Sequence, residues 1–283
     1  MDTKLQVFVL FTEDSIETIS DCGENFHWHF LKSPTMGWGE LTQMGNMIST
    51  MDNDSLQKLG KVNAAVGAKQ FMEMISCLNN FHCDKCGKDF GDVEKWGTDR
   101  LLALDGLSGL SRASKSLAIG WKPILSQPDW GVCMNVVEQL VYKLAHSLFC
   151  HLVLISHIEP EKDEVTGAIK NFPSTLGRKL GPSLPQHFKD VVLATRIGQD
   201  FRWNVVAQGT DTKARILPLS DKISPDFAAY LKLWESHGGE YISAPLPGKP
   251  SGIKMLLEGP PGTGKTYSLR TLTGVSIPAP KAP

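Results

Sequence analysis

The chain has 283 residues, of which 41% are hydrophobic, and a formal net charge of −1 at pH 7. A nearly neutral protein does not coat nucleic acid by bulk charge, and no apolar run approaches the ~18 residues of a membrane-spanning helix. The six cysteines are too sparse for a disulfide scaffold. We therefore expect one α/β domain over residues 1–283, cytoplasmic, with reduced thiols and no membrane contact.

Apolar runs that end in polar or small residues mark the strands in chain order. They are residues 5–11, 100–104, 151–156 and 190–195, followed late in the chain by 254–258. Because functional groups gather at the carboxyl ends of parallel strands, this pattern predicts a mostly parallel central sheet. Two later segments, 201–207 and 213–217, flank a Gln-Gly-Thr-Asp sequence and predict a β-hairpin.

Apolar residues recur with helical spacing in segments between the strands. These segments are residues 56–78, 132–149 and a closing helix at 226–234. The stripe of the second segment consists of Val136, Leu140, Leu144 and Leu148, and its simplest role is a core face. Strands that alternate with helices predict helices on both faces of the sheet.

Residues 77–98 are interpreted as a loop inserted before the second strand. Cys77, Cys83 and Cys86 have a spacing that resembles a zinc knuckle. A closed zinc site needs four ligands, so folding would have to bring His82 or Cys22 to complete it. Reduced thiols in a loop are the alternative.

Two further histidines occur early in the chain. His27 and His29 flank Trp28 in a sequence that alternates like a strand. Packing in the core or at a sheet edge is the expected role of this triplet, rather than metal binding.

Two carboxylates follow predicted strands where a metal-assisted reaction needs them. Asp105 ends the sequence LLALD, a Walker B-like pattern in which a buried strand delivers one carboxylate to Mg²⁺. Glu13 follows the first strand and is placed to polarise an attacking water. Asp14 and Glu17 compete with it, and acids are also favourable at a helix N-terminus without any catalytic role.

His157 follows the third strand and has two interpretations, a sensor of the γ-phosphate or a histidine that caps a strand end. The next segment, 165–189, contains Lys170, Arg178 and Lys179, several Gly and Pro residues, and no acid. This composition is typical of a flexible, locally basic contact surface. The alternative is a solvated loop whose charge is balanced by the acids just before it.

The sequence GPPGTGKT at 259–266 matches the phosphate-binding pattern GxxxxGK[ST] in full. In such a loop the glycines turn backbone N–H groups toward the phosphates, the lysine reaches the β and γ oxygens, and the threonine hydroxyl ligates Mg²⁺. A strand at 254–258 and a helical segment at 266–273 flank it. The predicted ATP-binding residues are Gly259, Pro260, Pro261, Gly262, Thr263, Gly264, Lys265, Thr266 and Tyr267. Thr266 and Asp105 are the predicted Mg²⁺ ligands.

With these motifs in place, the chain resembles the RecA-like ATPases, in particular the compact ATP-binding proteins of phages and prophages. In that family the P-loop is followed by a strand with the catalytic glutamate, the Walker B strand, and a strand that ends in a polar γ-phosphate sensor before a mobile loop. Here FVLFTED, RLLALDGLSGLS and HLVLISHIE keep the order of the last three. The resemblance covers residues 5 to about 241 and 243–273, and it implies that Glu13, Lys265 and His157 are the catalytic residues.

Only the P-loop departs from this order, because it stands last instead of first, and this position suggests circular permutation. The Pro- and Gly-rich segment 243–252 would link the old termini, and 277–283 would be a flexible tail. The strand at 254–258 would then be a central strand adjacent to the strand of Asp105. The competing explanation is a P-loop that begins a second domain missing from the chain.

The resemblance implies Mg²⁺-dependent ATP hydrolysis coupled to single-stranded DNA in recombination or annealing, in a bacterium or a phage-infected host cell. Lys170, Arg178 and Lys179 are then the candidates for DNA contact. It also implies a homo-oligomer, a ring or filament, in which Lys213 and Arg215 act on a neighbour's nucleotide, although ordinary surface charge explains these two as well. Two alternatives remain open: a nucleotide-dependent assembly or switch protein with a protein partner and weak hydrolysis, and a kinase, for which no acceptor motif or lid is evident.

Overall fold

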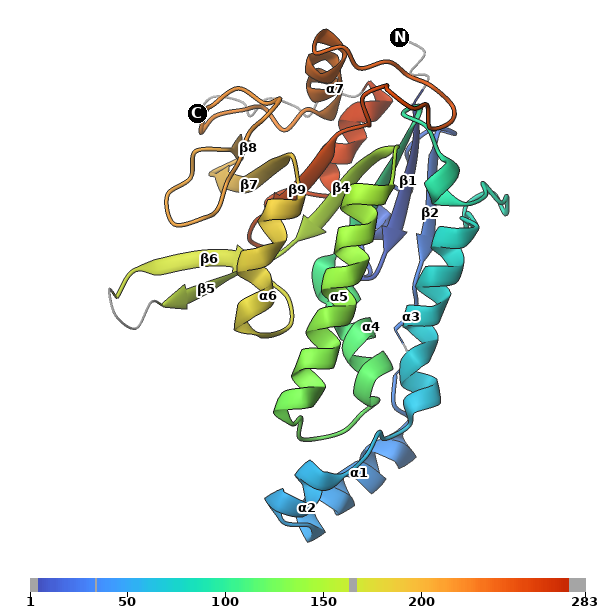
Figure 1. Cartoon of the computed structure of the whole chain (residues 1–283), viewed down its shortest axis with the longest axis vertical. Helices are drawn as coiled ribbons and strands as arrows, with labels where there is room; N and C mark the ends of the chain where they lie inside the picture. Colours follow the sequence, from blue (N-terminus) through green and yellow to red (C-terminus); the bar gives the residue numbers. More distant parts are fainter. Residues whose placement is uncertain (1–4, 34, 163–166, 275–283) are drawn as a thin grey trace.

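Seven strands form one mostly parallel sheet in the middle of the fold (Figure 1). The computed structural model describes residues 5–33, 35–162 and 167–274. In their order across the sheet the strands are β2 (Phe26–Phe30), β1 (Gln6–Phe11), β3 (Arg100–Asp105), β4 (His151–Ser156), β9 (Lys254–Glu258), β7 (Asp190–Ile197) and β8 (Asp200–Asn204). All neighbours pair in parallel except β7 and β8. The predicted α/β fold with a mostly parallel sheet is confirmed.

Alternate strand residues pack on opposite faces of this sheet. In β1, Phe8 and Leu10 belong to one buried cluster, whereas Val7 and Val9 belong to the other. Because both faces are covered, the interior strands must be apolar at nearly every position. This requirement explains why these strands are recognisable as continuous apolar runs in the sequence.

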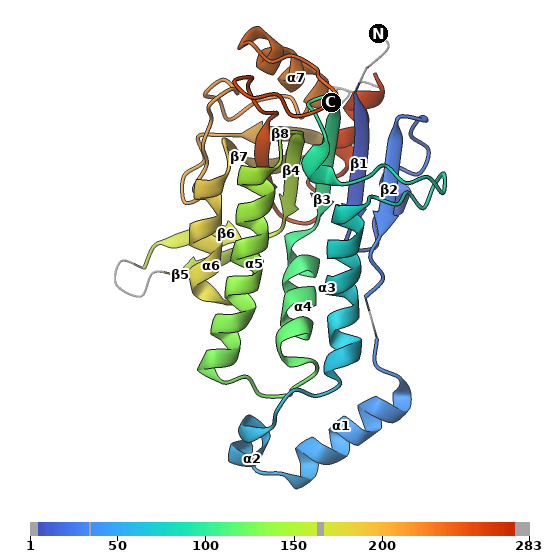
Figure 2. The ribbon, with the colours of Figure 1, turned by 45° about the vertical axis from the view of Figure 1, so that its right-hand side comes forward.

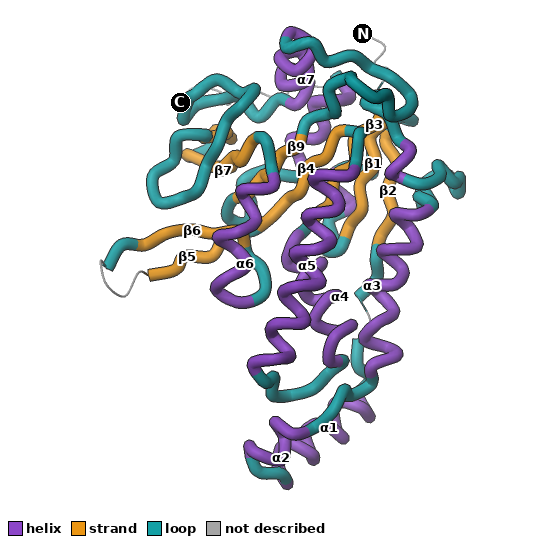
Figure 3. The backbone as a smooth tube through the Cα atoms, viewed as in Figure 1, coloured by secondary structure: helices purple, strands orange, loops and turns teal. Residues whose placement is uncertain are grey.

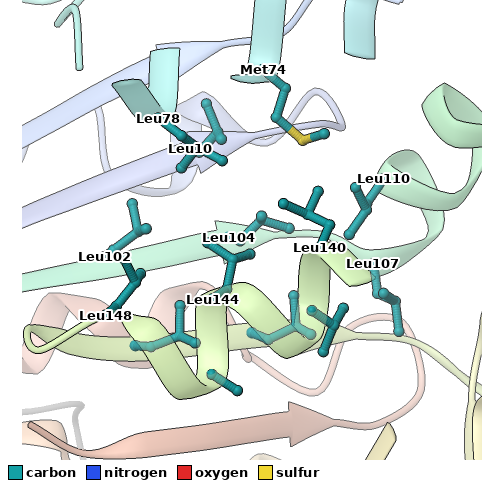
Figure 4. Close-up of a cluster of buried hydrophobic side chains, with 14 of the residues drawn as sticks. Leu10, Met74, Leu78, Leu102, Leu104, Leu107, Leu110, Leu140, Leu144 and Leu148 are labelled. Atoms are coloured by element: carbon teal, nitrogen blue, oxygen red, sulfur yellow. The ribbon is translucent and has the colours of Figure 1, made fainter. Parts of the chain in front are cut away.

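Three long helices cover the first face: α3 (Ala64–Asn79), α4 (Leu107–Ile119) and α5 (Gln127–Ser147). Figure 4 shows leucines of α4 and α5, with Met74 of α3, meeting Leu10, Leu102 and Leu104 of the strands. The leucines of the stripe predicted within 132–149 are buried in this cluster. Helix α5 begins earlier than expected because Ser126 and Asp129 form a capping box at its N-terminus.

The second face is covered by α7 (Phe227–Ser236) and by the 3-10 helix η4 (Tyr267–Thr273). Asp226 caps α7 by accepting hydrogen bonds from the amides of Ala228 and Ala229. Leu269 and Leu272 of η4 are buried with strand residues such as Val9. The expectation of helices on both faces is thus confirmed.

The remaining elements lie at the periphery. Helices α1 (Trp38–Thr50) and α2 (Asn53–Lys58) extend away from the sheet beyond the ends of α3 and α4 (Figure 2). A two-stranded hairpin, β5 (Ile158–Lys162) with β6 (Ile169–Pro173), projects from the sheet beside α6 (Gly177–Ser183), as Figure 3 shows. Three short 3-10 helices complete the described elements: η1 (Ile16–Thr18), η2 (Val93–Lys95) and η3 (Leu184–His187). None of the described helices is long and apolar enough to span a membrane.

Two predicted elements differ in the structure. The helix expected at 56–78 is two helices, because Gly60 follows α2 and Asn63, with φ of 48°, adopts the left-handed conformation before α3. The predicted hairpin of 201–207 with 213–217 is also wrong. β8 pairs instead with β7 through a two-residue turn at Gly198, whose φ is 64°, and Lys213 makes only an isolated bridge to Val191.

The segment 165–189, expected to be a flexible loop, is largely ordered into β6, α6 and η3. Its backbone groups are satisfied by pairing with β5 and by a hydrogen bond from the Asn171 amide to the Gly209 carbonyl. Leu180, Leu184 and Phe188 are buried in the first core cluster. These buried apolar residues hold the segment in place. Because they are spaced irregularly along the sequence, the composition of the segment suggested a flexible loop instead.

The strand of the P-loop, β9, is central, but it is not adjacent to the strand of Asp105. β4 lies between them and pairs with both β3 and β9. The expectation of adjacency is wrong because the loop after β9 is long enough to reach across β4, so contact between motifs does not require contact between strands. The linker at 243–252 runs past Gly97 and Phe149 before β9. The tail at 277–283 lies outside the described residues.

Candidate functional site

The carboxyl ends of four parallel strands meet at one edge of the sheet. In register, Phe11 of β1 stands opposite Asp105 of β3, and Asp105 opposite Ile155 of β4. Ser156 stands opposite Glu258 of β9. The residues that follow these positions, which include the predicted Glu13, His157 and P-loop, are therefore brought to the same edge, where open α/β sheets bind ligands.

The P-loop turns back on itself at two glycines in the left-handed region. Gly262 has φ of 76° and Gly264 has φ of 72°, and Gly264 also packs closely against the Phe201 ring. Within the described residues, the amides of Gly262, Thr263, Gly264 and Lys265 make no backbone hydrogen bond. Consecutive free amides of this kind form a cradle for an anion.

Lys265 lies across its own loop. Its Nζ donates to the carbonyl oxygens of Gly259 and Pro260, each at 2.9 Å. The residue is 6% exposed, and this burial lowers the pKa of the ammonium to about 8, against the opposing pull of Asp105 and Glu13. A poorly solvated ammonium next to free amides has a strong electrostatic preference for a phosphate.

Asp105 and Thr266 are joined directly. The Thr266 Oγ1 donates to Asp105 Oδ2 at 2.6 Å, and the Ser15 hydroxyl donates to the same oxygen at 3.1 Å. Asp105 is 7% exposed, and burial raises its carboxyl pKa while these two hydrogen bonds oppose the rise. A hydroxyl and a carboxylate at this distance are the oxygen donors that hold Mg²⁺ in P-loop proteins.

Glu13 has three polar neighbours at the same edge. Ser108 Oγ donates to Oε1 at 2.5 Å, Arg112 Nη2 lies 3.1 Å from Oε1, and His157 Nε2 lies 3.6 Å from Oε2. Thr12, the residue before Glu13, accepts a hydrogen bond from the Gly106 amide and donates one to its carbonyl. These contacts fix the Glu13 carboxylate at the same edge as Asp105 and Thr266, the predicted Mg²⁺ ligands.

Ser15, Ser108 and Arg112 are members of this site that the sequence analysis does not identify. Ser108 and Arg112 lie on α4, in the sequence GLSGLSRAS, whose small residues hide its helical period. Gly109 allows α4 to approach the end of β1, since a Cβ there would lie 2.2 Å from Thr12 Oγ1. The sequence feature that could have identified Ser108 and Arg112 is their position in a polar segment directly after the Walker B-like strand.

His157 connects the site to the projecting hairpin. Its Nδ1 is buried without a hydrogen-bond partner among the described residues, and its carbonyl accepts from the Ser174 amide at 2.7 Å. The residue stands between β4 and β5. The His157 side chain therefore lies beside the Glu13 carboxylate, and its backbone leads directly into the hairpin.

The other predicted residues lie apart from this cluster. Lys213 and Arg215 are beside the beginning of β7, where Asp190 Oδ1 accepts from the Arg215 amide. Lys170 is exposed on β6 and Lys179 is exposed on α6, whereas the side chain of Arg178 lies outside the described part of the structure. Tyr267 is the first residue of η4. The guanidinium carbon of Arg270 lies over the Tyr267 ring, 5.4 Å from the ring centroid.

Two of the three cysteines named for a zinc site come together in the structure, with a histidine that the sequence analysis did not assign to it. The ligand atoms of Cys83, Cys86 and His27 all lie within 4.8 Å of one another. Cys77 is buried on α3 and is not a member of this group. His82 bonds to Asp89 instead. His27 also packs as expected on an edge strand, stacked on Phe8, but the packing role does not exclude a ligand role.

No family model, curated protein sequence or solved structure matches this chain significantly. The functional assignment therefore depends on the geometry at the carboxyl edge of the sheet and on the motifs that this edge brings together.

Proposed function

We propose that this chain is a P-loop ATPase of RecA-like type that binds ATP with Mg²⁺ and hydrolyses it. The observation that carries the proposal is the hydrogen bond between Thr266 and Asp105, which are separated by 161 positions in the chain. Two motifs identified independently in the sequence form one oxygen-rich site, with Lys265 on one side and Glu13 on the other. The parallel sheet brings the strand ends to one edge, and the direct hydrogen bond between Thr266 and Asp105 is the closer contact that a shared metal ion needs.

Each residue then has one task in the reaction. The loop amides and Lys265 would bind the β- and γ-phosphates, and Thr266 and Asp105 would hold Mg²⁺, which would neutralise phosphate charge. Glu13 orients the attacking water and accepts its proton as the water oxygen bonds to the γ-phosphorus and the bond to the ADP oxygen breaks. Arg112 and Ser108 hold the Glu13 carboxylate in place, and His157 senses whether the γ-phosphate is present.

Circular permutation is supported by the position of β9 inside the sheet. A P-loop that opened a second domain would not be expected to pair with both β4 and β7 of the first. The helix after the P-loop is also docked on the start of the fold, because Arg270 forms an ion pair with Asp21 and donates to the Thr18 carbonyl at 2.9 Å. This contact places η4 against the segment that follows β1, an arrangement compatible with the unpermuted order in which η4 precedes β1.

We further propose that hydrolysis is coupled to single-stranded DNA at the hairpin. The hairpin begins at Ile158, one residue after the proposed sensor, and it projects from the sheet edge (Figure 3). Lys170 and Lys179 would contact DNA phosphates there, together with Arg178. Assembly into a ring or filament would let Lys213 and Arg215 reach a neighbour's nucleotide.

The alternative is a nucleotide-dependent switch that acts on a protein partner. The observation in its favour is the charge of the hairpin, where Glu161 stands opposite Lys170 in the register. A hairpin of mixed charge is less suited to a polyanion than a uniformly basic one. In both proposals the hairpin is coupled to the nucleotide through His157. The two proposals therefore differ in the partner that binds the hairpin and not in the nucleotide chemistry.

Steady-state phosphate release, with and without single-stranded DNA, tests both proposals. We expect Mg²⁺-dependent ATP turnover that Lys265→Ala abolishes and that the surface variant Lys232→Ala leaves unchanged. Turnover that DNA increases supports the recombination function, and turnover indifferent to DNA favours the switch. Equal residual rates in the wild-type protein and Lys265→Ala would overturn the ATPase proposal itself.

A further inference from the structure

The loop after α3 brings two cysteines to the edge strand of the sheet, at a point that the proposed ATPase site does not use. Cys83 and Cys86 belong to this loop, and His27 belongs to β2. Cys86 Sγ lies 3.7 Å from His27 Nδ1, and the three ligand atoms are mutually within 4.8 Å. We propose that Cys83, Cys86 and His27 bind a zinc ion.

The spacing of these atoms suits tetrahedral zinc. With Zn–S of about 2.3 Å and Zn–N of about 2.0 Å, a sulphur and a nitrogen bound to the same tetrahedral ion stand about 3.5 Å apart. The 3.7 Å between Cys86 Sγ and His27 Nδ1 is within about 0.2 Å of this value. Two soft thiolates and an imidazole are a ligand set that selects zinc over the hard cations Mg²⁺ and Ca²⁺.

The loop has the backbone of a metal knuckle. The Gly87 amide donates to the Cys83 carbonyl at 2.8 Å, and the Cys83 amide donates to the Lys88 carbonyl at 2.9 Å. Gly87 has φ of 69°, which a glycine adopts without strain directly after the second cysteine. Burial raises the pKa of the Cys83 thiol, and backbone hydrogen bonds to its sulphur, the Cys86 amide's foremost, oppose this rise only in part.

The knuckle is fixed to β2 by contacts that involve no ligand atom. The Asp84 amide donates to the Trp28 carbonyl at 2.8 Å, and the Asp84 carboxylate accepts from the Phe30 amide. Lys85 Nζ donates to the carbonyls of Cys22 and Gly23, each at 2.8 Å. These contacts hold the two cysteines in place opposite His27, so the site is organised before a metal binds.

The surroundings of His27 suit a ligand. Its ring is stacked on Phe8, with centroids 4.9 Å apart and planes at 23°, so its orientation is fixed. His27 is 6% exposed, and its Nδ1 faces the Cys86 sulphur at 3.7 Å. Cys86 is exposed, which leaves the fourth coordination position to a water molecule from solvent.

Such a zinc ion would fasten the loop over residues 80–99 to the open edge of the sheet. β2 is an edge strand, and an uncovered edge can pair with other chains. The loop leads directly into β3, which carries Asp105. The inferred role is to hold this loop in place through three protein ligands, with the fourth position open instead of the closed four-ligand set, and it is independent of ATP hydrolysis.

Metal analysis and cobalt substitution in reducing buffer test the site. We expect the purified protein to hold about one equivalent of zinc. Metal-free protein should bind one Co²⁺ with the charge-transfer and ligand-field absorption of a tetrahedral thiolate site. Cys86→Ser, at an exposed position, should fold and should bind Co²⁺ at least about tenfold more weakly.

Cys77→Ala is the matched control, because Cys77 precedes the knuckle but is not a ligand. We expect it to keep the wild-type cobalt spectrum, whereas His27→Gln loses intensity and affinity. Folding of every variant is checked by circular dichroism without metal. Zinc far below one equivalent in metal-loaded protein, or unchanged cobalt binding in both Cys86→Ser and His27→Gln, would overturn the proposal. A loss in Cys77→Ala equal to that in Cys86→Ser would overturn the ligand set.

Discussion

Thr266 Oγ1 donates a hydrogen bond of 2.6 Å to Asp105 Oδ2, although β4 separates the strands that carry the two residues. The P-loop begins beside the end of β4, where the Gly259 amide donates to the Ser156 carbonyl at 3.2 Å. This contact combines the phosphate-binding loop and the acidic strand end into one site.

Thr266 and Asp105 should act as a coupled pair in metal binding. We expect Thr266→Ala and Asp105→Asn each to weaken Mg²⁺-dependent ATP-analogue binding by about tenfold. The double variant should lose little more than either single variant, with a coupling free energy of at least about 1 kcal/mol in calorimetric titrations. Strictly additive losses would mean that the two residues do not share a metal ion.

Glu13 should be needed for turnover but not for binding. Replacing it with Gln keeps the hydrogen-bonding shape but removes the proton acceptor, so hydrolysis should fall at least about 100-fold with nearly unchanged nucleotide affinity. Asp14→Asn, one position away and exposed, is the matched control and should keep the wild-type rate. If the Asp14 variant is the inactive one, the general base has been assigned to the wrong residue.

Glu258, the last residue of β9, should make stability depend on pH. It is 1% exposed, and burial raises its pKa from 4.5 to about 8. The folded protein therefore keeps a proton that the unfolded chain has released, so this contribution is complete below pH 4.5 and is lost as pH rises toward 8. In urea titrations, the free energy of unfolding of the wild-type protein should fall as pH rises through this window. Glu258→Gln should make that fall smaller by on the order of 3 kcal/mol.

The control for that measurement is Glu17→Gln, which changes an exposed carboxylate and should keep the wild-type slope. A wild-type stability that is constant over this pH range would show that Glu258 is solvated or paired in the folded state.

The basic residues of the hairpin and α6 should contribute to DNA binding through charge alone. We expect Lys170→Ala combined with Lys179→Ala to weaken single-stranded DNA binding for all sequences and to reduce the slope of log affinity against log salt by about 1.4. The exposed pair Lys222→Ala and Lys232→Ala removes the same charge elsewhere and should leave the slope unchanged. Equal effects of both pairs would indicate only non-specific attraction.

The buried strands and the P-loop are predictable from the sequence because each has a strong local cause. A strand covered on both faces needs a continuous apolar run, and a phosphate cradle needs glycines and a lysine at fixed spacing. Helix α4 is less visible, because its sequence is rich in Gly and Ser. Helix α1 has no buried residue at all, so no core-facing stripe marks it.

The relationships across the chain are not predictable in this way. The order of β3, β4 and β9 depends on how three separate segments pack, and the apolar pattern is the same for any order. His27 joins Cys83 and Cys86 only because β2 and the loop after α3 meet in space, and Cys77 is excluded because α3 directs it into the core. Sequence spacing identifies the knuckle but not its partner.

Calorimetric titration of the full chain with a non-hydrolysable ATP analogue, with and without Mg²⁺, tests the ATPase proposal most directly. We expect one binding site per chain, with affinity that falls at least about tenfold when Mg²⁺ is removed and is lost in Lys265→Ala. Absence of binding by the folded wild-type protein, or equal binding by Lys265→Ala, would contradict the proposal.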